Sequence, residues 1–425
     1  MAVWKKHAAF PVLALAISVI VIVITSVYSR KDNGTFYWKD LSGSRDAIGI
    51  VAIGGELRDG YHRTSFRLQN GKLSAQTEVF EQARLAEMYR YISGGYKRIG
   101  NKQYYIDGQG EYRIHSLIRM ASTGLYAIPE GTAIVSPSIY YRLSNGDGSP
   151  ASANPLEYGL AGIGDKVFFT VPVSYGATGT SGIYELSFTE WYNATQFPDK
   201  NPKPRQLAEI SLEANESDVP PNIEILGLEA VGDKLALLSV EHNELHVTSY
   251  DSKSGKLLGK AIVPQFYLSG RPGSPPSDQD HTHDERYEAY SDNEHGILNI
   301  SFGSSKSYVL SFDFNNGVKL LNAITASFPE GVDDPLRCLT DISYRDNKLY
   351  IVKTFREQRP DPADPSQDRM LPLHFYLYVY DHEKLVYKGE LVTALNDDTA
   401  ILGAAREQFS IEQKDFRYFT NFTIE

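Results

Sequence analysis

The chain has 425 residues, of which 42% are hydrophobic, and its formal net charge is −11 at pH 7. This composition supports a sizeable core and excludes wholesale disorder, and the length allows two or three ordinary domains or one large all-β domain. The acidic balance argues against a nucleic-acid-binding surface, which needs clustered Lys and Arg. The single cysteine, Cys338, excludes an intramolecular disulfide, so an exported fold would have to rely on its core.

An apolar segment without charged side chains lies near the N-terminus, at residues 8–29. Roughly 20 apolar residues are enough to cross the hydrocarbon core of a membrane as a helix. Lys5-Lys6 and Arg30-Lys31 flank the segment almost equally, so the positive-inside rule does not decide its orientation. An N-terminal apolar segment ahead of a large polar region usually acts as a start-transfer signal.

We therefore predict that residues 1–29 form a cytoplasmic stub and a single transmembrane anchor, and that the rest of the chain is extracytoplasmic in a bacterial cell envelope. The alternative is a cleaved signal peptide, for which Val27-Tyr28-Ser29 offers a suitable site. The apolar segment is longer than the usual h-region of about 7–15 residues, which favours the anchor.

Residues 30–45 are predicted to be a juxtamembrane linker, ahead of an extracytoplasmic domain at residues 46–425. In this linker Phe36, Tyr37 and Trp38 either lie at the level of the lipid headgroups or begin the folded domain.

The first part of the domain contains both strand and helix signals. The apolar run at residues 47–53 predicts a buried strand that ends at Gly54-Gly55. Tyr61–Leu68 alternates between apolar and polar residues, and Asn70-Gly71 predicts a tight hairpin to a return strand at Lys72–Val79. Glu78–Ile92 has apolar residues near helical intervals and is predicted as a helix that ends before Gly94-Gly95.

Internal repetition is the most informative feature of the remaining sequence. An aromatic residue followed by Asp precedes a polar turn at Tyr250-Asp251, Phe312-Asp313 and Tyr380-Asp381. Each Asp can fix its turn by accepting a hydrogen bond from the amide two residues on. Gly255 and Gly317, in the first two turns, suit a backbone with positive φ. The clearest copy is Gly232–Val263, which we predict as three short strands joined by tight turns.

This pattern resembles the blades of β-propellers, particularly the Tyr-Asp-x-x-x-Gly-Lys blades of quinoprotein-like and related propellers. The resemblance covers roughly residues 100–395 and identifies no specific family. It implies an all-β fold, a propeller of about five to seven blades, and the alternative architecture is a pair of β-sandwiches. The spacing near 60 residues exceeds the propeller repeat of about 40–50 residues, and long loops account for the excess. Phe409–Ile424 is predicted to pair with the N-terminal strand around Ile48 and to close the ring.

Two long loops contain the candidate site residues. In the first, His281 and His283 lie in a His-x-His pattern, which places both imidazoles on one side of an extended chain. Asp280 and Asp284 flank them, and a carboxylate could complete the ligands of a divalent metal ion. The alternative is a solvated loop, because the Arg-Pro-Gly-Ser-Pro-Pro segment just before it has loop composition.

The second loop mixes both charge signs with several prolines and contains Arg356, Arg359 and Arg369. We predict an extended excursion with polyproline character. Long loops on one face of a propeller often build its binding surface. The resemblance therefore implies a partner site formed by Asp280, His281, His283, Asp284, Arg356, Arg359 and Arg369.

Catalytic signatures are missing from the sequence: it contains no Gly-x-Ser-x-Gly elbow, no His-Glu-x-x-His pair, no phosphate-binding loop and no dinucleotide fingerprint. We therefore expect a membrane-anchored binding or scaffolding protein without a cofactor, apart from the possible divalent metal ion, and with an envelope protein, a peptide or a glycan as its partner. The alternative is an exported propeller enzyme, either a glycan hydrolase or lyase or a quinoprotein-like oxidoreductase, with converging carboxylates or histidines. A sensor that signals inward is a third hypothesis, although only seven residues precede the apolar segment.

Overall fold

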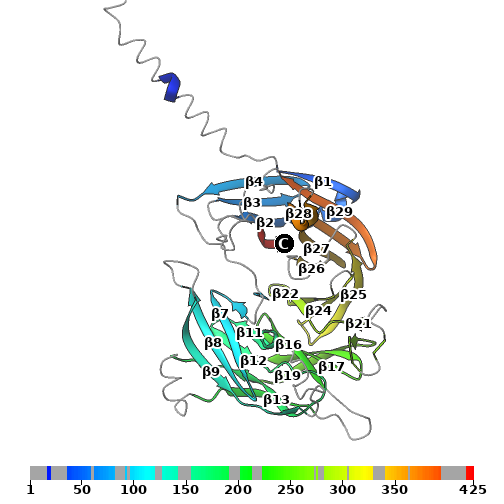
Figure 1. Ribbon diagram of the computed structural model, residues 1–425. Coiled ribbons are helices and arrows are strands. Elements are labelled where there is room, and N and C mark those ends of the chain that lie inside the picture. The colour runs from blue at the N-terminus through cyan, green and yellow to red at the C-terminus, as the bar shows by residue number, and fades with distance from the viewer. Residues whose placement is uncertain are drawn as a thin grey trace, which may run out of the picture. The chain divides into compact units, whose positions relative to one another are not determined.

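The computed structural model describes most of the chain as β-strands (Figure 1). The described residues are 17–20, 36–58, 62–81, 91–92, 96–119, 127–141, 155–190, 202–212, 223–271, 274–275, 282–303, 306–328, 340–361, 364–393 and 418–425. The chain divides into two compact units, which are described separately. Unit 1 comprises Met1–Ala86, Arg356–Leu377 and Tyr387–Glu425, and unit 2 comprises Glu87–Phe355 and Tyr378–Val386.

Unit 2 contains consecutive strands that pair in chain order as four-stranded antiparallel sheets. The first such sheet is β16 (Glu224–Val231), β17 (Lys234–Glu241), β18 (Glu244–Asp251) and β19 (Leu257–Val263). The next is β22 (Tyr287–Asp292), β23 (Ile297–Phe302), β24 (Lys306–Asp313) and β25 (Lys319–Ser327). Antiparallel sheets of four strands are the blades of β-propellers. The predicted all-β, generic β-propeller type is therefore confirmed at the level of the sheets.

The earlier part of unit 2 forms two larger sheets. One has the order β14 (Thr189–Glu190), β9 (Ala127–Val135), β8 (Glu111–Arg119), β7 (Lys102–Gln109), β6 (Tyr96–Ile99), β5 (Tyr91–Ile92). The other has the order β10 (Ser138–Tyr141), β13 (Ala177–Glu185), β12 (Lys166–Phe169), β11 (Leu160–Ile163), and β15 (Arg205–Ser211) also pairs with β13. A 3-10 helix, η3 (Leu156–Gly159), leads into β11, and β20 (Tyr267–Leu268) pairs in parallel with β21 (Thr282–His283).

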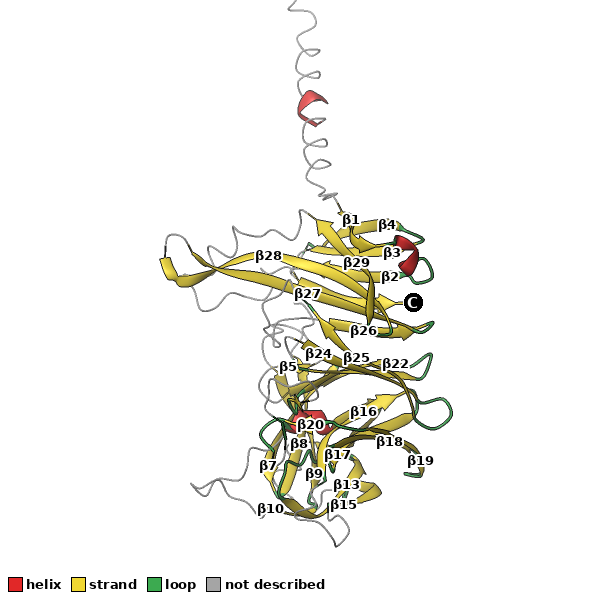
Figure 2. Ribbon diagram, turned by 90° about the vertical axis from the view of Figure 1, so that its right-hand side faces the viewer, coloured by secondary structure: helices red, strands yellow, loops and turns green. Residues whose placement is uncertain are grey.

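A further sheet has five strands. Its order is β1 (Phe36–Gly43), β29 (Lys384–Thr393), β28 (Asp364–Asp381), β27 (Lys348–Asp361), β26 (Thr340–Arg345). Strands β27 and β28 contain 14 and 18 residues, whereas β26 contains 6. The β27–β28 hairpin therefore extends well beyond its neighbours, as Figure 2 shows.

Unit 1 contains a sheet in which the C-terminal strand pairs with a strand from the first part of the domain. Its order is β30 (Tyr418–Ile424), β2 (Ile53–Arg58), β3 (His62–Gln69), β4 (Lys72–Val79). The predicted pairing of the C-terminal segment with the N-terminal part of the domain is confirmed for Tyr418–Ile424, with Phe419 opposite Leu57, but the partner is β2 and not the segment around Ile48, which is a 3-10 helix. The predicted hairpin is confirmed as well, because Asn70 and Gly71 connect β3 to β4 with φ angles of 49° and 70°.

The three predicted Asp turns occupy equivalent places in the structure. Asp251, Asp313 and Asp381 each end the third strand of a sheet, namely β18, β24 and β28. The Asn315 amide donates to Asp313 Oδ1 at 2.8 Å, two residues on as predicted. At Asp251 the donor is the Ser254 amide, three residues on, at 2.7 Å.

The clearest predicted segment, Gly232–Val263, does form three strands, β17 to β19, and both faces of β17 are buried. Leu235 and Leu237 contribute to one apolar cluster, and Ala236, Leu238 and Val240 contribute to another. Alternate residues of a strand point to opposite faces, so a strand covered on both sides reads as a continuous apolar run. This explains the continuous apolar sequence Leu-Ala-Leu-Leu-Ser-Val of β17.

Two predictions near the start of the domain are wrong. Residues 47–53 are not one strand: Arg45–Ile48 form a 3-10 helix, η2, which begins after Ser44, whose side chain accepts from the Asp46 amide. Strand β2 begins only at Ile53 and continues through Gly54-Gly55. A Cβ at residue 55 would lie 2.6 Å from Cζ of Phe66, so this glycine provides close packing inside the strand instead of ending it.

The predicted helix over Glu78–Ile92 is wrong at both ends, since Glu78 and Val79 belong to β4 and Tyr91-Ile92 form β5. Its central residues, 82–90, lie outside the described residues. Pairing with β3 across the Asn70-Gly71 hairpin satisfies the backbone of β4 through Val79, and this tertiary pairing outweighs local helical spacing.

The N-terminal region bears on the membrane prediction only in part. Residues 17–20 are helical, and the rest of the predicted span, 8–16 and 21–29, lies outside the described residues. Within the described ranges, no helix is both long enough and apolar enough to cross a membrane.

Phe36 and Trp38 begin the folded domain, which was one of the two alternatives for this segment. Phe36 stacks on Phe66 at 6.4 Å between ring centroids. Trp38 is 7% exposed, and its Nε1 donates to the Tyr387 hydroxyl at 2.5 Å. Tyr37, between them on β1, is 52% exposed, as the alternation of a strand with one buried face requires.

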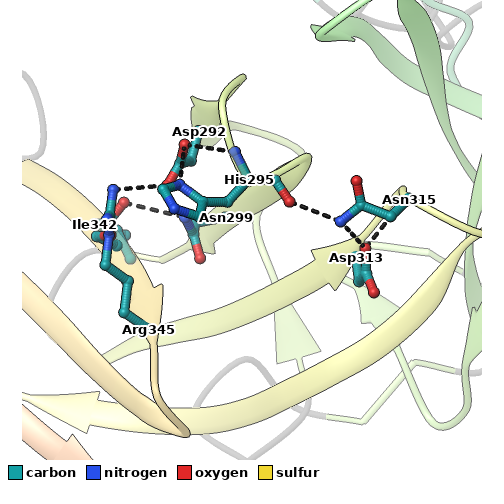
Figure 3. A network of polar contacts seen from close by, with 8 residues as sticks. Asp292, His295, Asn299, Asp313, Asn315, Ile342 and Arg345 are labelled. Atoms are coloured by element: carbon teal, nitrogen blue, oxygen red, sulfur yellow. Dashed lines mark hydrogen bonds and ion pairs between the residues drawn. The ribbon is translucent and has the colours of Figure 1, made fainter. Parts of the chain in front are cut away.

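A polar network links the β22–β23 turn to the end of β26 (Figure 3). Asp292 Oδ2 accepts from Arg345 Nη2 at 2.9 Å and lies 3.0 Å from His295 Nδ1. Asn299 donates to the Ile342 carbonyl oxygen at 3.1 Å. Burial of Asp292 opposes ionisation, but hydrogen bonds from His295 and the charge of Arg345 outweigh it, so the pKa of this carboxyl is lowered.

We expect Asp292→Asn to cost about 1–2 kcal/mol at pH 7, because a charged hydrogen-bond acceptor is lost. A lowered folded-state pKa means that this stabilisation is present above the unfolded value near pH 4 and is lost as the pH falls through the folded pKa. Urea denaturation should therefore show a larger difference between the variant and the wild type at pH 7 than at pH 3. Asp284→Asn, at an exposed position, is the control and should behave like the wild type at both pH values. An equal cost of Asp292→Asn at both pH values would contradict the prediction.

Candidate functional site

Edge strands of successive sheets lie side by side in unit 2, with β11 next to β16, and β16 next to β22. Together with β6 they bring ionisable side chains into the interior. Lys97 of β6, Glu229 of β16 and Tyr287 of β22 are 2%, 1% and 2% exposed. Buried charges at this level of exposure need partners, because leaving water is costly for each of them.

These three side chains satisfy one another. Lys97 Nζ donates to the Leu160 carbonyl oxygen at 2.5 Å and lies 3.2 Å from Glu229 Oε1. The Tyr287 hydroxyl donates to the same carboxylate oxygen at 3.1 Å. We call Lys97, Glu229 and Tyr287 the buried ionic cluster.

The surroundings of the buried ionic cluster are tightly packed. The rings of Tyr158 and Tyr287 are 4.8 Å apart, and a Cβ at Gly227 would lie 2.0 Å from the Tyr287 hydroxyl oxygen. Only glycine therefore allows β16 to pass this hydroxyl. Burial, together with the negative charges of Glu288 and Glu157, raises the pKa of Tyr158 well above its ordinary value, so its hydroxyl stays protonated.

The next residue of β22, Glu288, points to the other side of the strand and has a different character. It is partly buried and accepts a hydrogen bond from the Tyr290 hydroxyl at 3.0 Å. Burial raises the pKa of Glu288 to about 7, although the Tyr290 hydrogen bond and the charge of Lys353 act in the opposite direction. Lys353 Nζ itself lies 4.3 Å from the centroid of the Phe328 ring. A carboxyl that titrates near neutrality is typical of functional sites.

Glu288→Gln is expected to change how stability depends on pH. A raised carboxyl pKa makes the folded state bind more protons than the unfolded state between about pH 4.5 and 7, so stability falls as the pH rises through this window. The neutral amide removes this loss, and we expect the variant to be more stable than the wild type at pH 8 by at least about 1 kcal/mol. At pH 4.5 the two proteins should unfold at the same denaturant concentration. Parallel curves across the whole range would contradict a raised pKa.

The loop between β19 and β22 is held by a second charged group. Arg271 donates through Nε to Glu224 at 2.9 Å and through Nη2 to Glu285 at 2.8 Å. Glu224 is the first residue of β16, and Glu285 lies just before β22. Arg271 therefore attaches the loop to the start of β16 and to the segment just before β22.

Of the residues predicted for a metal site, the structure describes His283 and Asp284. His283 is 8% exposed in β21, where its ring stacks on Phe266 at 4.6 Å and on Tyr308 at 4.7 Å. Asp284 is exposed, and Asp280 and His281 lie outside the described residues. Among the residues that the structure describes, no group of three or more His, Cys, Asp and Glu side chains is placed to hold a metal ion. A site that involves His281 stays a prediction.

The predicted loop with three arginines is wrong in its conformation. Arg356 and Arg359 lie in β27, and Arg369 lies in β28, so the segment is a paired hairpin and not an unpaired polyproline excursion. Pairing satisfies the backbone amides and carbonyls that an unpaired excursion would leave to water. Pro362, in the connection between the strands, lies outside the described residues.

Sequence reasoning missed Lys97, Glu229, Tyr287 and Glu288. One signal was available: Glu229 lies in Leu-Gly-Leu-Glu-Ala-Val, where a carboxylate with apolar neighbours on both sides indicates a buried, paired charge. Its partner Lys97 is 132 residues away, a separation that no local pattern reveals.

Comparisons with known proteins add little to this description. No family model matches the chain, and no curated protein matches it. Among solved structures, a protein from Lactobacillus plantarum aligns with 80% of this chain and 99% of its own, at 10% identity and a TM-score of 0.27.

Two further solved structures are similarly distant. The WD40 domain of Toxoplasma gondii coronin aligns over 86% of this chain and 88% of its own, at 9% identity and a TM-score of 0.29. A prolyl endopeptidase aligns over 78% of this chain and 53% of its own, at 12% identity and a TM-score of 0.20. Likenesses at this level assign no function, and the generic β-propeller type rests on the sheets of the chain itself.

Proposed function

We propose that the protein is a membrane-anchored, extracytoplasmic binding or scaffolding protein of the cell envelope. Its β-strands would form a propeller of about five to seven blades, held to the membrane by a helix at residues 8–29. The partner would be another envelope protein, a peptide or a glycan.

The observation that carries this proposal is the buried ionic cluster. In a propeller enzyme, converging carboxylates and basic groups would line an accessible pocket. Here Lys97, Glu229 and Tyr287 converge from β6, β16 and β22, but at 2% exposure or less they contact one another and stabilise the packing of the sheets. A partner would therefore be recognised by the outer parts of the fold.

The β27–β28 hairpin is the part best suited to contact a partner, because it extends beyond the strands beside it. Arg356, Arg359 and Arg369 lie along it, and guanidinium groups bind carboxylates and planar polar groups well. Asp280, His281, His283 and Asp284 remain a second proposed contact region, with His283 acting through packing.

The test is site-specific photocrosslinking of the full-length chain in its native membrane. A crosslinker at Arg359 should capture a discrete partner, whereas one at Lys260, an exposed residue of β19, should not. Charge reversal at Arg356 and Arg369 should abolish the capture. Equal labelling from both positions, or none above background at Arg359, would count against the proposal.

A specific observation favours an exported enzyme as the second candidate. A carboxyl with a pKa of about 7, such as Glu288, can act as a general acid near neutral pH, for example toward a glycosidic oxygen. If so, envelope glycan incubated with the purified protein should be cleaved, and the rate should fall as the pH rises above about 7, where Glu288 loses its proton. Glu288→Gln should abolish cleavage while the fold is kept. Product formation that survives this substitution would exclude Glu288 as the acid.

A further inference from the structure

One face of unit 1 gathers aromatic and basic side chains on adjacent strands. The register between β1 and β29 pairs Tyr37 with Val392 and Lys39 with Glu390. Paired residues of an antiparallel ladder project to the same side. The residues between them, Trp38 and Leu391, project to the core and are 7% and 1% exposed. Tyr37 and Lys39 therefore lie on the outer side of the sheet, and both are more than half exposed.

Strands β29 and β28 continue the same side of the sheet, where exposure decreases: Lys388 and Glu390 of β29 are half-buried, and Tyr376 of β28 is 8% exposed. Lys388 precedes Glu390 by two residues and so shares its side, with its Nζ 4.8 Å from the centroid of the Tyr376 ring. His374 stacks on the same ring at 5.8 Å, and its Nδ1 lies 3.2 Å from Glu390 Oε1. We call this set the β1 face; it consists of Tyr37, Lys39, His374, Tyr376, Lys388 and Glu390.

The charge of the β1 face has the opposite sign to that of the chain. The β1 face contains two lysines, Lys39 and Lys388, and one carboxylate, Glu390. With histidine counted as neutral its net charge is 2 − 1 = +1, whereas the whole chain carries −11. The Glu390 carboxylate is only 15% exposed and lies between Lys39 and His374. The exposed side chains are therefore those of Lys39 and Tyr37, with Lys388 half-buried beside the Tyr376 ring, and lysine and tyrosine are side chains that favour lipid headgroups.

The length of the connecting chain limits where this face can lie. Six residues, 30–35, separate the end of the predicted anchor from Phe36, the first residue of β1. At about 3.3–3.6 Å per residue they reach at most about 22 Å. The first strand of the domain cannot leave the neighbourhood of the bilayer, and two more cations, Arg30 and Lys31, lie in the connecting chain itself.

We infer that the β1 face is a membrane-contact surface that binds anionic lipid headgroups and holds unit 1 against the bilayer. This inference rests on the anchor in the proposed function. It adds an oriented contact, with Lys39 and Lys388 as the cations and Tyr37 as the interfacial ring.

The test uses the full-length chain reconstituted in vesicles of phosphatidylcholine, alone or mixed with phosphatidylglycerol. With Cys338 replaced by Ser, a single cysteine is introduced by Ser42→Cys and labelled with a polarity-sensitive fluorophore. Ser42 pairs with Lys388 and so samples the β1 face without altering it. Val79→Cys, on the exposed side of β4 in the same unit, is the matched control position.

We expect a headgroup-attached quencher to quench the label at residue 42 at least about threefold more than the label at residue 79, only in vesicles with phosphatidylglycerol and less at high salt. Lys39→Glu with Lys388→Glu should remove the difference. Lys72→Glu with Lys260→Glu changes the net charge equally at exposed lysines elsewhere and should leave it intact.

Equal quenching at the two positions, or quenching that does not depend on the presence of phosphatidylglycerol, would overturn the inference. Flotation of the vesicles after an alkaline wash tests independently whether the N-terminal anchor is inserted in the membrane. A chain that stays with the vesicles but shows no difference between residues 42 and 79 retains its anchor and loses only the β1 face. A chain that is washed off refutes the anchor, and with it both proposals.

Discussion

Lys97→Met is expected to lower the free energy of unfolding by about 3–5 kcal/mol, the usual cost of removing one partner from a buried ion pair. Methionine has a similar length and is easily packed, so the loss comes from the charge and not from a cavity. The Glu229 carboxylate would remain 1% exposed and would have lost the ammonium group that lies 3.2 Å away. Urea denaturation at pH 7 measures the effect.

Two controls make this prediction specific. Lys102→Met breaks an ion pair with Glu130 in which both side chains are more than one-third exposed, and it should cost no more than about 1 kcal/mol. Combining Lys97→Met with Glu229→Gln removes both buried charges. The double variant should lose clearly less free energy of unfolding than the sum of the losses in the two single variants. If Lys97→Met cost as little as Lys102→Met, the buried ionic cluster would not be a strong contribution to stability.

Removal of residues 418–425 is expected to unfold unit 1. Strand β30 pairs with β2 and contributes Phe419 and Ile424, which are 0% and 6% exposed. The Phe419 ring lies 5.3 Å from the ring of Phe375 and 6.0 Å from that of Phe66. Without β30, the backbone groups of β2 and these aromatic rings would be exposed together, and an unpaired apolar edge promotes aggregation.

A single substitution separates the apolar contribution from the backbone pairing. Phe419→Ala should cost about 3–5 kcal/mol, as other buried Phe-to-Ala changes do. Thr423→Ala, at an exposed position of the same strand, should cost less than about 1 kcal/mol. Thermal unfolding and size-exclusion chromatography measure both effects, and a synthetic peptide of residues 418–425 added in trans should restore part of the stability of the shortened chain. A shortened chain that stays monomeric with an unchanged Tm would contradict the role of β30.

Local patterns identified those elements whose partners are close in sequence. Asn70-Gly71 predicted its hairpin because two consecutive positive φ angles are needed there. The repeated Asp turns predicted equivalent strand ends, because a short carboxylate side chain can bond the nearby backbone. The same reasoning failed at Gly54-Gly55, where the need for glycine comes from the Phe66 ring on the neighbouring strand.

The sequence alone therefore determined the all-β class, the blade-like repeat and the contact between the two ends of the domain, because alternation and turn chemistry act over a few residues. Only the tertiary structure decided that β27 and β28 form a long hairpin, that His283 is packed between aromatic rings, and that Lys97 meets Glu229. These features depend on backbone pairing, ring stacking and charge neutralisation between residues far apart in the chain. Such interactions gain their strength from burial, and burial is a property of the folded chain as a whole.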